Sequence, residues 1–94
     1  MSLVSKKQYG RVPVLDYNWN GWATLWAYLN LWGVDTSEFT GWNDGDPIGP
    51  ETCRVIAQAI RKHFKELSAE DRKWLRGHAA KWQAFAETGG CLQW

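Results

Sequence analysis

The sequence has few of the residues that usually mark a specialised protein. It contains two cysteines, three prolines and one methionine, and its 94 residues carry a formal net charge of only +1. Two cysteines do not make the disulfide framework of a small secreted domain, and the first residues lack the apolar run of a signal peptide, so we expect a cytoplasmic protein. No apolar run approaches the roughly 20 residues that span a bilayer, which excludes a membrane-spanning segment.

The charges are few, but they are unevenly distributed along the chain. Residues 1–11 carry +3, residues 12–49 carry −5 without a single Lys or Arg, and residues 50–94 carry +3. This balance is unlike that of a strongly basic nucleic-acid binder, so a nucleic-acid partner is not expected. We interpret the acidic middle as satisfied within the fold, and the alternative is an acidic patch that is offered to a partner.

Tryptophan, by contrast, is abundant, with eight residues spread along the chain. A chain of this length has room for one core, and each buried aromatic side chain removes roughly 150–250 Å² from water. We therefore predict a single domain built around a tryptophan-rich core. Helical spacing assigns the following tryptophans to that core, the last at its edge: Trp22, Trp26, Trp32, Trp74, Trp82 and Trp19.

Apolar spacing and terminal residues predict three helices. The first spans about 20–32, with Asn18 or Asn20 as its cap and Gly33 at its end. The second spans about 50–66 and begins with a proline, which is favoured at the first helical position.

The third helix is predicted to begin at the Ser68 cap and to end at the glycine pair 89–90. Because only two residues separate it from the second helix, the two are expected to form an antiparallel hairpin. Gly77, Ala80 and Ala84 share the outer side of this helix, where their small size permits the close approach of another element or of a second copy. The oligomeric state is not fixed by the sequence.

The two ends of the chain are predicted to behave differently. Residues 1–10 mix polar and basic types without periodicity and are expected to form a mobile arm, whereas residues 11–94 form a single globular domain. Residues 11–15 are strand-like and are expected to pair with the alternating tail 91–94. The predicted fold class is therefore mainly α, with three helices around a tryptophan-rich core and a small two-stranded edge.

No spacing in the sequence matches a metal site or a catalytic group. The residues of zinc-binding type lack the short spacings of a zinc clip: Cys53, His63, His78 and Cys91. The Asn-Asp-Gly-Asp turn at 43–46 offers oxygen ligands but lacks the glutamate that an EF-hand needs at its twelfth position. A nucleophile such as Cys53 needs a base and an orienting acid, and His63 and Asp71 lie too far along the chain to be placed beside it. We expect no catalytic residue, no metal and no cofactor.

Three local motifs resemble those of small uncharacterised bacterial and phage proteins. They are the tryptophan-rich first helix at 19–32, the Asn-Asp-Gly turn at 43–45 and the Gly-Gly pair that opens the tail 89–94. This chain departs from that pattern in having a shorter segment between its second and third helices. Because those proteins have no assigned activity, the resemblance implies an origin and transfers no site residue.

Two tryptophans, Trp42 and Trp94, follow no helical phase. Trp42 lies in the acidic loop with Asn43, Asp44 and Asp46, and exposed aromatic residues beside a polar rim mark binding surfaces. We expect these five residues to form the binding site of a small non-enzymatic interaction or regulatory domain whose partner is a protein. The alternative is a small-ligand or nucleotide-derivative binding domain with an aromatic-walled pocket, where Asn43, Asp44 or a buried histidine orients the ligand.

Overall fold

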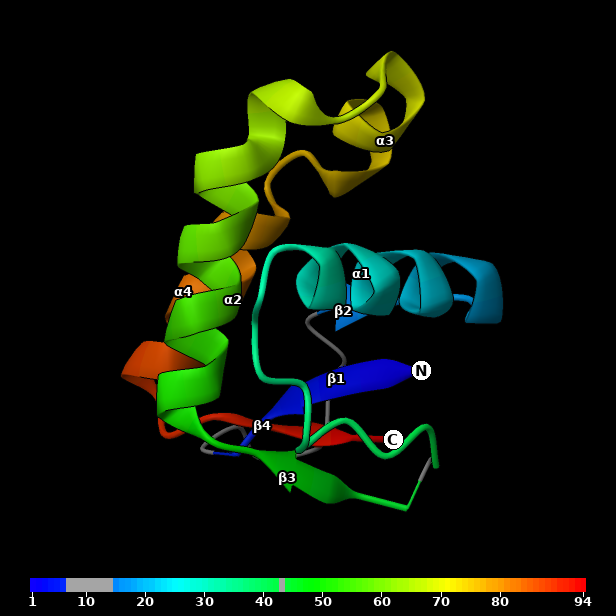
Figure 1. Cartoon of the computed structure of the whole chain (residues 1–94). Helices are drawn as coiled ribbons and strands as arrows, with labels where there is room; N and C mark the ends of the chain where they lie inside the picture. Colours follow the sequence, from blue (N-terminus) through cyan, green and yellow to red (C-terminus); the bar gives the residue numbers. More distant parts are fainter. Residues whose placement is uncertain (7–14, 43) are drawn as a thin grey trace.

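A computed structural model describes residues 1–6, 15–42 and 44–94 of the chain. The elements of this part, in chain order, are β1 (Ser2–Ser5), β2 (Leu15–Asp16), α1 (Trp19–Leu31), β3 (Asp46–Ile48), α2 (Pro50–His63), a 3₁₀ turn (Phe64–Glu66), α3 (Ala69–Leu75), α4 (His78–Glu87) and β4 (Cys91–Gln93). In Figure 1, α1 runs across the molecule above the strands, and α2 and α4 stand side by side at one end. No helix of the described ranges is long and apolar enough to cross a membrane.

Helix α1 begins and ends at the residues that its sequence predicts. The Asn18 side chain accepts a hydrogen bond from the backbone N–H of Gly21 at 2.7 Å, which satisfies one of the free donors at the helix start. At the other end, Gly33 has a φ of +76°, a left-handed conformation that glycine adopts without strain. The first predicted helix is therefore confirmed.

Helix α2 also confirms its prediction, although its last turn tightens into the 3₁₀ segment. Its start is held by the Glu38 carboxylate, which accepts hydrogen bonds from the Gly49 N–H at 3.0 Å and from the Thr52 hydroxyl. A carboxylate at this place is favourable because the helix dipole is positive at the N-terminus. The acidic loop before α2 thus contributes directly to the helix that follows it.

The prediction of one continuous third helix is wrong. The chain does leave the Ser68 cap, whose hydroxyl accepts a hydrogen bond from the Asp71 N–H at 3.1 Å, but α3 ends at Leu75. Gly77 then takes a φ of +81°, which breaks the helical path before α4 starts. Glycine makes this break possible because its missing Cβ removes the usual steric penalty. Gly77, Ala80 and Ala84 are exposed.

The β structure is larger than the predicted two-stranded edge. Four antiparallel strands form one sheet in the order β2-β1-β4-β3. Leu3 of β1 pairs with Leu15 on one side and with Gln93 on the other, so β1 lies inside the sheet. The tail strand β4 accordingly pairs with β1 and β3, and Leu15 pairs with β1 instead of with the tail.

The prediction of a mobile N-terminal arm is wrong for residues 2–5. Leu3 and Val4 are buried, and burial of two adjacent aliphatic side chains on a central strand fixes this segment. Four residues are too short a run for periodicity to reveal, so this strand could not be predicted from residue spacing. The remaining residues of the predicted arm, 7–10, and residues 11–14 of the predicted strand lie outside the described residues.

The core lies between α1, the sheet and the α2–α4 pair, and its centre is aromatic. Trp22 and Trp82 are both buried, and each stacks with Phe39, with ring centroids 4.6 and 6.4 Å apart. The aromatic core is therefore confirmed, but not for every tryptophan assigned to it. Three of them are only half-buried, namely Trp26, Trp32 and Trp74, and Trp19 is exposed.

Candidate functional site

Helix α1 has one face in the core and one face in solvent. Trp22, Leu25 and Leu29 are buried, whereas Trp19 is 59% exposed and Leu31 is 77% exposed. We call the solvent side the outer face of α1; its residues are Trp19, Asn20, Ala23, Ala27, Asn30 and Leu31. None of the 13 residues of this helix is charged, which is unusual because a surface helix normally carries charged residues on its solvent side.

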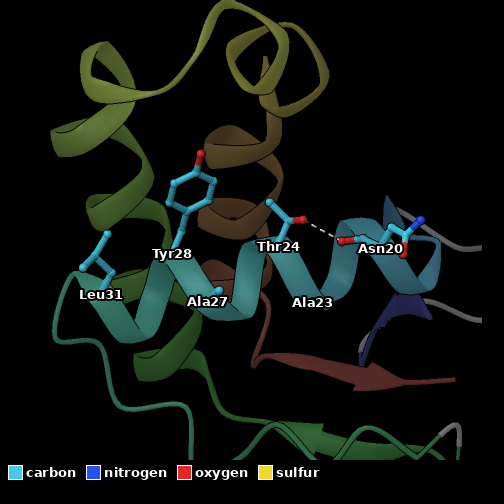
Figure 2. A pocket seen from close by; sticks show the side chains of 6 residues that line it. All are labelled: Asn20, Ala23, Thr24, Ala27, Tyr28 and Leu31. Carbon is cyan, nitrogen blue, oxygen red and sulfur yellow. Dashed lines mark hydrogen bonds between the residues drawn. The ribbon is translucent and has the colours of Figure 1, made fainter.

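A hollow of about 530 Å³ runs along this outer face. Its lining residues are Asn20, Ala23, Thr24, Ala27, Tyr28 and Leu31. Figure 2 shows Thr24 and Tyr28 pointing to the same side of α1, with Leu31 near the C-terminal end of the helix. The small side chains of Ala23 and Ala27 form the floor. We call this concavity the apolar hollow, because apolar atoms make up most of its surface.

A second hollow, of about 470 Å³, adjoins the first at the N-terminal half of α1. It is lined from β2, α1, α3 and α4 by Asp16, Tyr17, Asn18, Asn20, Gly21, Thr24, Glu70, Asp71, Trp74 and His78. Three of these residues are acids, and none of the lining residues in the described ranges is a Lys or Arg. We call this concavity the acidic cleft. Asn20 and Thr24 line both hollows, so the two are neighbours on the surface.

Asp71 is the most strongly held acid of the cleft. Its carboxylate accepts a hydrogen bond from the Tyr28 hydroxyl and another from the Trp74 indole N–H at 2.8 Å. The hydrogen bond from Tyr28, followed by that from Trp74, lowers the pKa of Asp71, so the group stays ionised near neutral pH. These contacts also fix the Trp74 ring as a wall of the cleft.

A chain of three polar side chains lies at the bottom of the cleft. The Trp82 indole N–H donates to the Tyr17 hydroxyl oxygen at 3.2 Å, and this hydroxyl lies 2.8 Å from Nδ1 of His78. An indole only donates, so the Tyr17 hydroxyl keeps its own proton for a hydrogen bond with the imidazole. Burial, followed by the positive charge of Lys81, lowers the pKa of His78 and keeps the imidazole neutral. Burial raises the pKa of Tyr17 far above its ordinary value, which keeps the hydroxyl protonated.

The predicted binding residues lie in a different place, on the loop around Gln93. Gln93 is fully buried, and its side-chain amide donates to the carbonyls of Glu38 at 2.9 Å and Asp46 at 3.3 Å. Its side-chain oxygen accepts from the Thr40 N–H at 3.2 Å, and its backbone carbonyl accepts from the Gly45 N–H at 2.6 Å. One buried amide thus organises the whole loop.

The structure places the predicted site residues on this loop in different environments. Trp42 is 69% exposed and Asp44 is exposed, as expected of a binding surface. Asp46 instead accepts a hydrogen bond from the Thr40 hydroxyl at 3.0 Å, which gives it a structural role. Asn43 lies outside the described residues.

Trp94 is not the exposed aromatic that the sequence predicts. Its backbone N–H donates to the Ser2 carbonyl at 2.8 Å, and its ring lies directly over Gly45. A Cβ at position 45 would come within 2.6 Å of this ring. Trp94 is therefore half-buried because the tail continues along β1 and closes onto the turn.

The acidic middle of the chain is largely satisfied within the fold by hydroxyl and backbone donors. Asp16 accepts from the Ser2 hydroxyl at 3.1 Å, and Asp35 accepts from the Ser37 N–H at 2.9 Å. In the part of the chain that the structure describes, the salt bridges are local ones within 51–66. Within the described ranges, hydroxyl and backbone donors hold four of the middle acids: Asp16, Asp35, Glu38 and Asp46.

The cysteines meet, whereas the histidines lie apart from them. Cys53 and Cys91 are buried with their Sγ atoms 4.0 Å apart, and the hydrogen bond with Cys53, together with burial, raises the pKa of the Cys91 thiol. His63 instead stacks on Trp32 with centroids 4.7 Å apart and bonds Glu66. The residues weighed for nucleophilic catalysis are thus not assembled, and the described residues hold no group of three metal-ligating side chains.

Sequence reasoning missed the acidic cleft because its parts are distant in sequence. Tyr17 and His78 are 61 positions apart, and neither stands in a recognisable motif. The one available signal was the absence of charge from α1. Comparison with known protein families, curated proteins and solved structures finds no match.

Proposed function

We propose that this chain is a small non-enzymatic interaction or regulatory domain that binds another protein on the outer face of α1. The observation that carries the proposal is the exposure of Trp19 and Leu31 on a helix without a charged residue. Water-exposed apolar surface beside a hollow is costly for a monomer, and its burial by a partner is favourable. An origin in bacteria or phage and a cytoplasmic location stay predictions from the sequence.

Photo-cross-linking tests this proposal in cells of the source organism. The photoreactive residue p-benzoylphenylalanine is placed at Leu31 in one variant and at Gln58, on the exposed side of α2, in a control. We expect a covalent adduct of defined mass from the Leu31 position and none from the Gln58 position. Equal adducts from both positions, or none from either, would contradict a binding surface on α1.

A second candidate function is the binding of a small ligand in the acidic cleft. The observation that favours it is the aromatic wall of the cleft, where Tyr17, Trp74 and His78 surround a volume of about 470 Å³. The half-buried His78 lines this cleft, which supports the expectation that a histidine orients such a ligand. A thermal-shift screen with metabolites and nucleotides tests this function, because a ligand that binds only the folded state raises the melting temperature. The rise should disappear in Trp74→Ala.

A further inference from the structure

The apolar hollow and the acidic cleft lie next to each other along α1, and we call the two together the trough. Asn20 and Thr24 belong to both, and Leu31 closes the apolar end. From Asn20 to Leu31 the helix rises by roughly 16 Å, at about 1.5 Å per residue. Figure 2 shows these two residues at opposite ends of the labelled row. A single helical partner segment of about three turns, at about 5.4 Å per turn, is long enough to lie over both parts.

The two ends of the trough differ in charge. The apolar end has no ionisable side chain other than the Tyr28 hydroxyl, and that hydroxyl is engaged by Asp71. The other end is lined by Asp16, Glu70 and Asp71, with no Lys or Arg among the lining residues that the structure describes. Facing carboxylates without a base attract a cation, and the low polarity of the adjoining walls strengthens that attraction.

The aromatic wall of the cleft reinforces this preference. Trp74 lines the cleft and is held in place by its hydrogen bond to Asp71. A Lys or Arg side chain beside an indole face gains a cation–π attraction in addition to the carboxylate charge. An acidic or neutral partner group would gain neither contribution.

Resting on the proposed function, we propose that the partner is an amphipathic protein segment that seats an aliphatic side chain in the apolar hollow and a Lys or Arg in the acidic cleft. The aliphatic side chain packs on Ala23 and Ala27, and Leu31 covers its outer edge. The basic group lies between Glu70 and Asp16. The apolar contact supplies the affinity and the charge pair selects the partner and its direction along α1.

A second copy of this chain is a poorer occupant of the trough. If two copies paired through α1, each trough would be covered by the α1 helix of the other copy, which contains no Lys or Arg. The three carboxylates of each cleft would then gain no base from that helix. Self-association through this face is therefore an alternative outcome of the test.

Two synthetic helical peptides of equal length test the proposal directly. Both carry Leu at the same four-residue spacing, one has Lys and the other Glu at all remaining charged positions, and each bears a fluorescent label. Fluorescence anisotropy is measured against the full chain at 1–500 μM. We expect the Lys peptide to bind at least about tenfold more tightly than the Glu peptide, and to weaken several-fold as salt rises from about 0.05 to 0.3 M.

Three variants of exposed residues locate the binding. Glu70→Gln should weaken the Lys peptide about fivefold, whereas Glu87→Gln, the matched loss of one charge on α4, should leave its affinity within about twofold. Leu31→Ser should weaken both peptides, because it removes apolar contact from the hollow. Circular dichroism and melting temperature confirm that each variant folds like the parent protein.

Several results would overturn the proposal. Equal binding of the two peptides, or equal effects of Glu70→Gln and Glu87→Gln, would remove the role of the cleft charges. Displacement of the Lys peptide by spermidine at equal concentration would favour the small-ligand function. Dimers in sedimentation that Leu31→Ser abolishes would favour a second copy.

The failure of this inference is distinguishable from the failure of the proposed function. An adduct from the Leu31 cross-linker without any Lys preference leaves the binding surface in place and contradicts the partner chemistry. The absence of both adduct and peptide binding contradicts the surface itself.

Discussion

Two regions of the molecule expose a tryptophan, and they differ in what surrounds it. Trp42 stands on a loop whose backbone is held by Thr40 and by the buried amide of Gln93. Trp19 is the first residue of α1. The backbone of this helix is satisfied by its own hydrogen bonds, so the side chains beside Trp19 need not be polar. The exposed area of one aromatic residue is therefore a weak sign of a binding surface, and a contiguous uncharged surface is a stronger one.

The two regions also depend on the rest of the fold to different degrees. The loop is ordered by contacts from the tail strand β4, more than 40 residues away along the chain. Helix α1 is defined by its own cap and terminal glycine. We therefore expect mutations in the loop to change the free energy of unfolding, and mutations on the outer face of α1 to change partner binding.

Gln93→Leu should have the largest effect on stability. The change keeps the side-chain volume but leaves the Thr40 N–H and the carbonyls of Glu38 and Asp46 without their buried partner. At about 1 kcal/mol or more for each unsatisfied group, we expect the unfolding free energy to fall by about 3 kcal/mol. Denaturant titration measures this loss. A change below about 1 kcal/mol would show that the amide does not organise the loop.

Gly45→Ala should be the next most harmful change, and Gly33→Ala is its matched control. Both glycines have positive φ, but a Cβ at Gly45 would collide with the Trp94 ring, whereas a Cβ at Gly33 would meet nothing within 4 Å. We expect a loss of about 2 kcal/mol for Gly45→Ala and about 1 kcal/mol for Gly33→Ala. Equal losses would contradict the packing of Trp94 on the turn.

A smaller effect is expected from His78 on the pH dependence of stability. Because burial lowers its pKa in the folded state below the ordinary 6.5, the unfolded chain binds the proton more readily. Its contribution is complete above pH 6.5 and is lost as the pH falls through the folded-state pKa. The neutral variant His78→Gln should lose less unfolding free energy than the parent protein between pH 7.5 and 5. Parallel curves would argue against a buried neutral imidazole.

Trp42→Ala should have the smallest effect on stability. Its side chain is mostly exposed, and the hydrogen bonds of residue 42 to Thr40 use backbone atoms that the variant keeps. We expect a change within about 0.5 kcal/mol. If this folded variant no longer captured the partner, the loop and not α1 would be the binding surface. If a variant with both Trp42 and Trp94 replaced by Ala still captured the partner, the predicted binding role of the loop would be wrong.

The sequence predicted those elements whose signals are local. The ends of α1 and the Ser68 cap depend on neighbouring residues, so they were predictable. The break at Gly77 was not, because one glycine is tolerated inside many helices and only tertiary packing decides. The strand at Leu3 and Val4 was missed because its pairing partners, β2 and β4, are more than ten residues away along the chain.

The candidate sites also differ in whether their signals are local in the sequence. The exposure of Trp42 was predictable from its loop, whereas the position of Trp94 depended on a sheet that the sequence does not show. The acidic cleft joins Asp16, Glu70 and His78 from separate elements, and no spacing within the chain brings them together. The binding role of the loop residues stays a prediction beside the proposed role of α1.

Nuclear magnetic resonance of the ¹⁵N-labelled protein compares the two regions in one experiment. The indole N–H of Trp74 reports on the acidic cleft, that of Trp42 reports on the loop, and the amide of Ala27 reports on the floor of the apolar hollow. Titration with the Lys peptide should shift the signals of Trp74 and Ala27 and leave that of Trp42 unchanged. A shift of the Trp42 signal with unchanged Trp74 and Ala27 signals would contradict the assignment of the binding surface to α1.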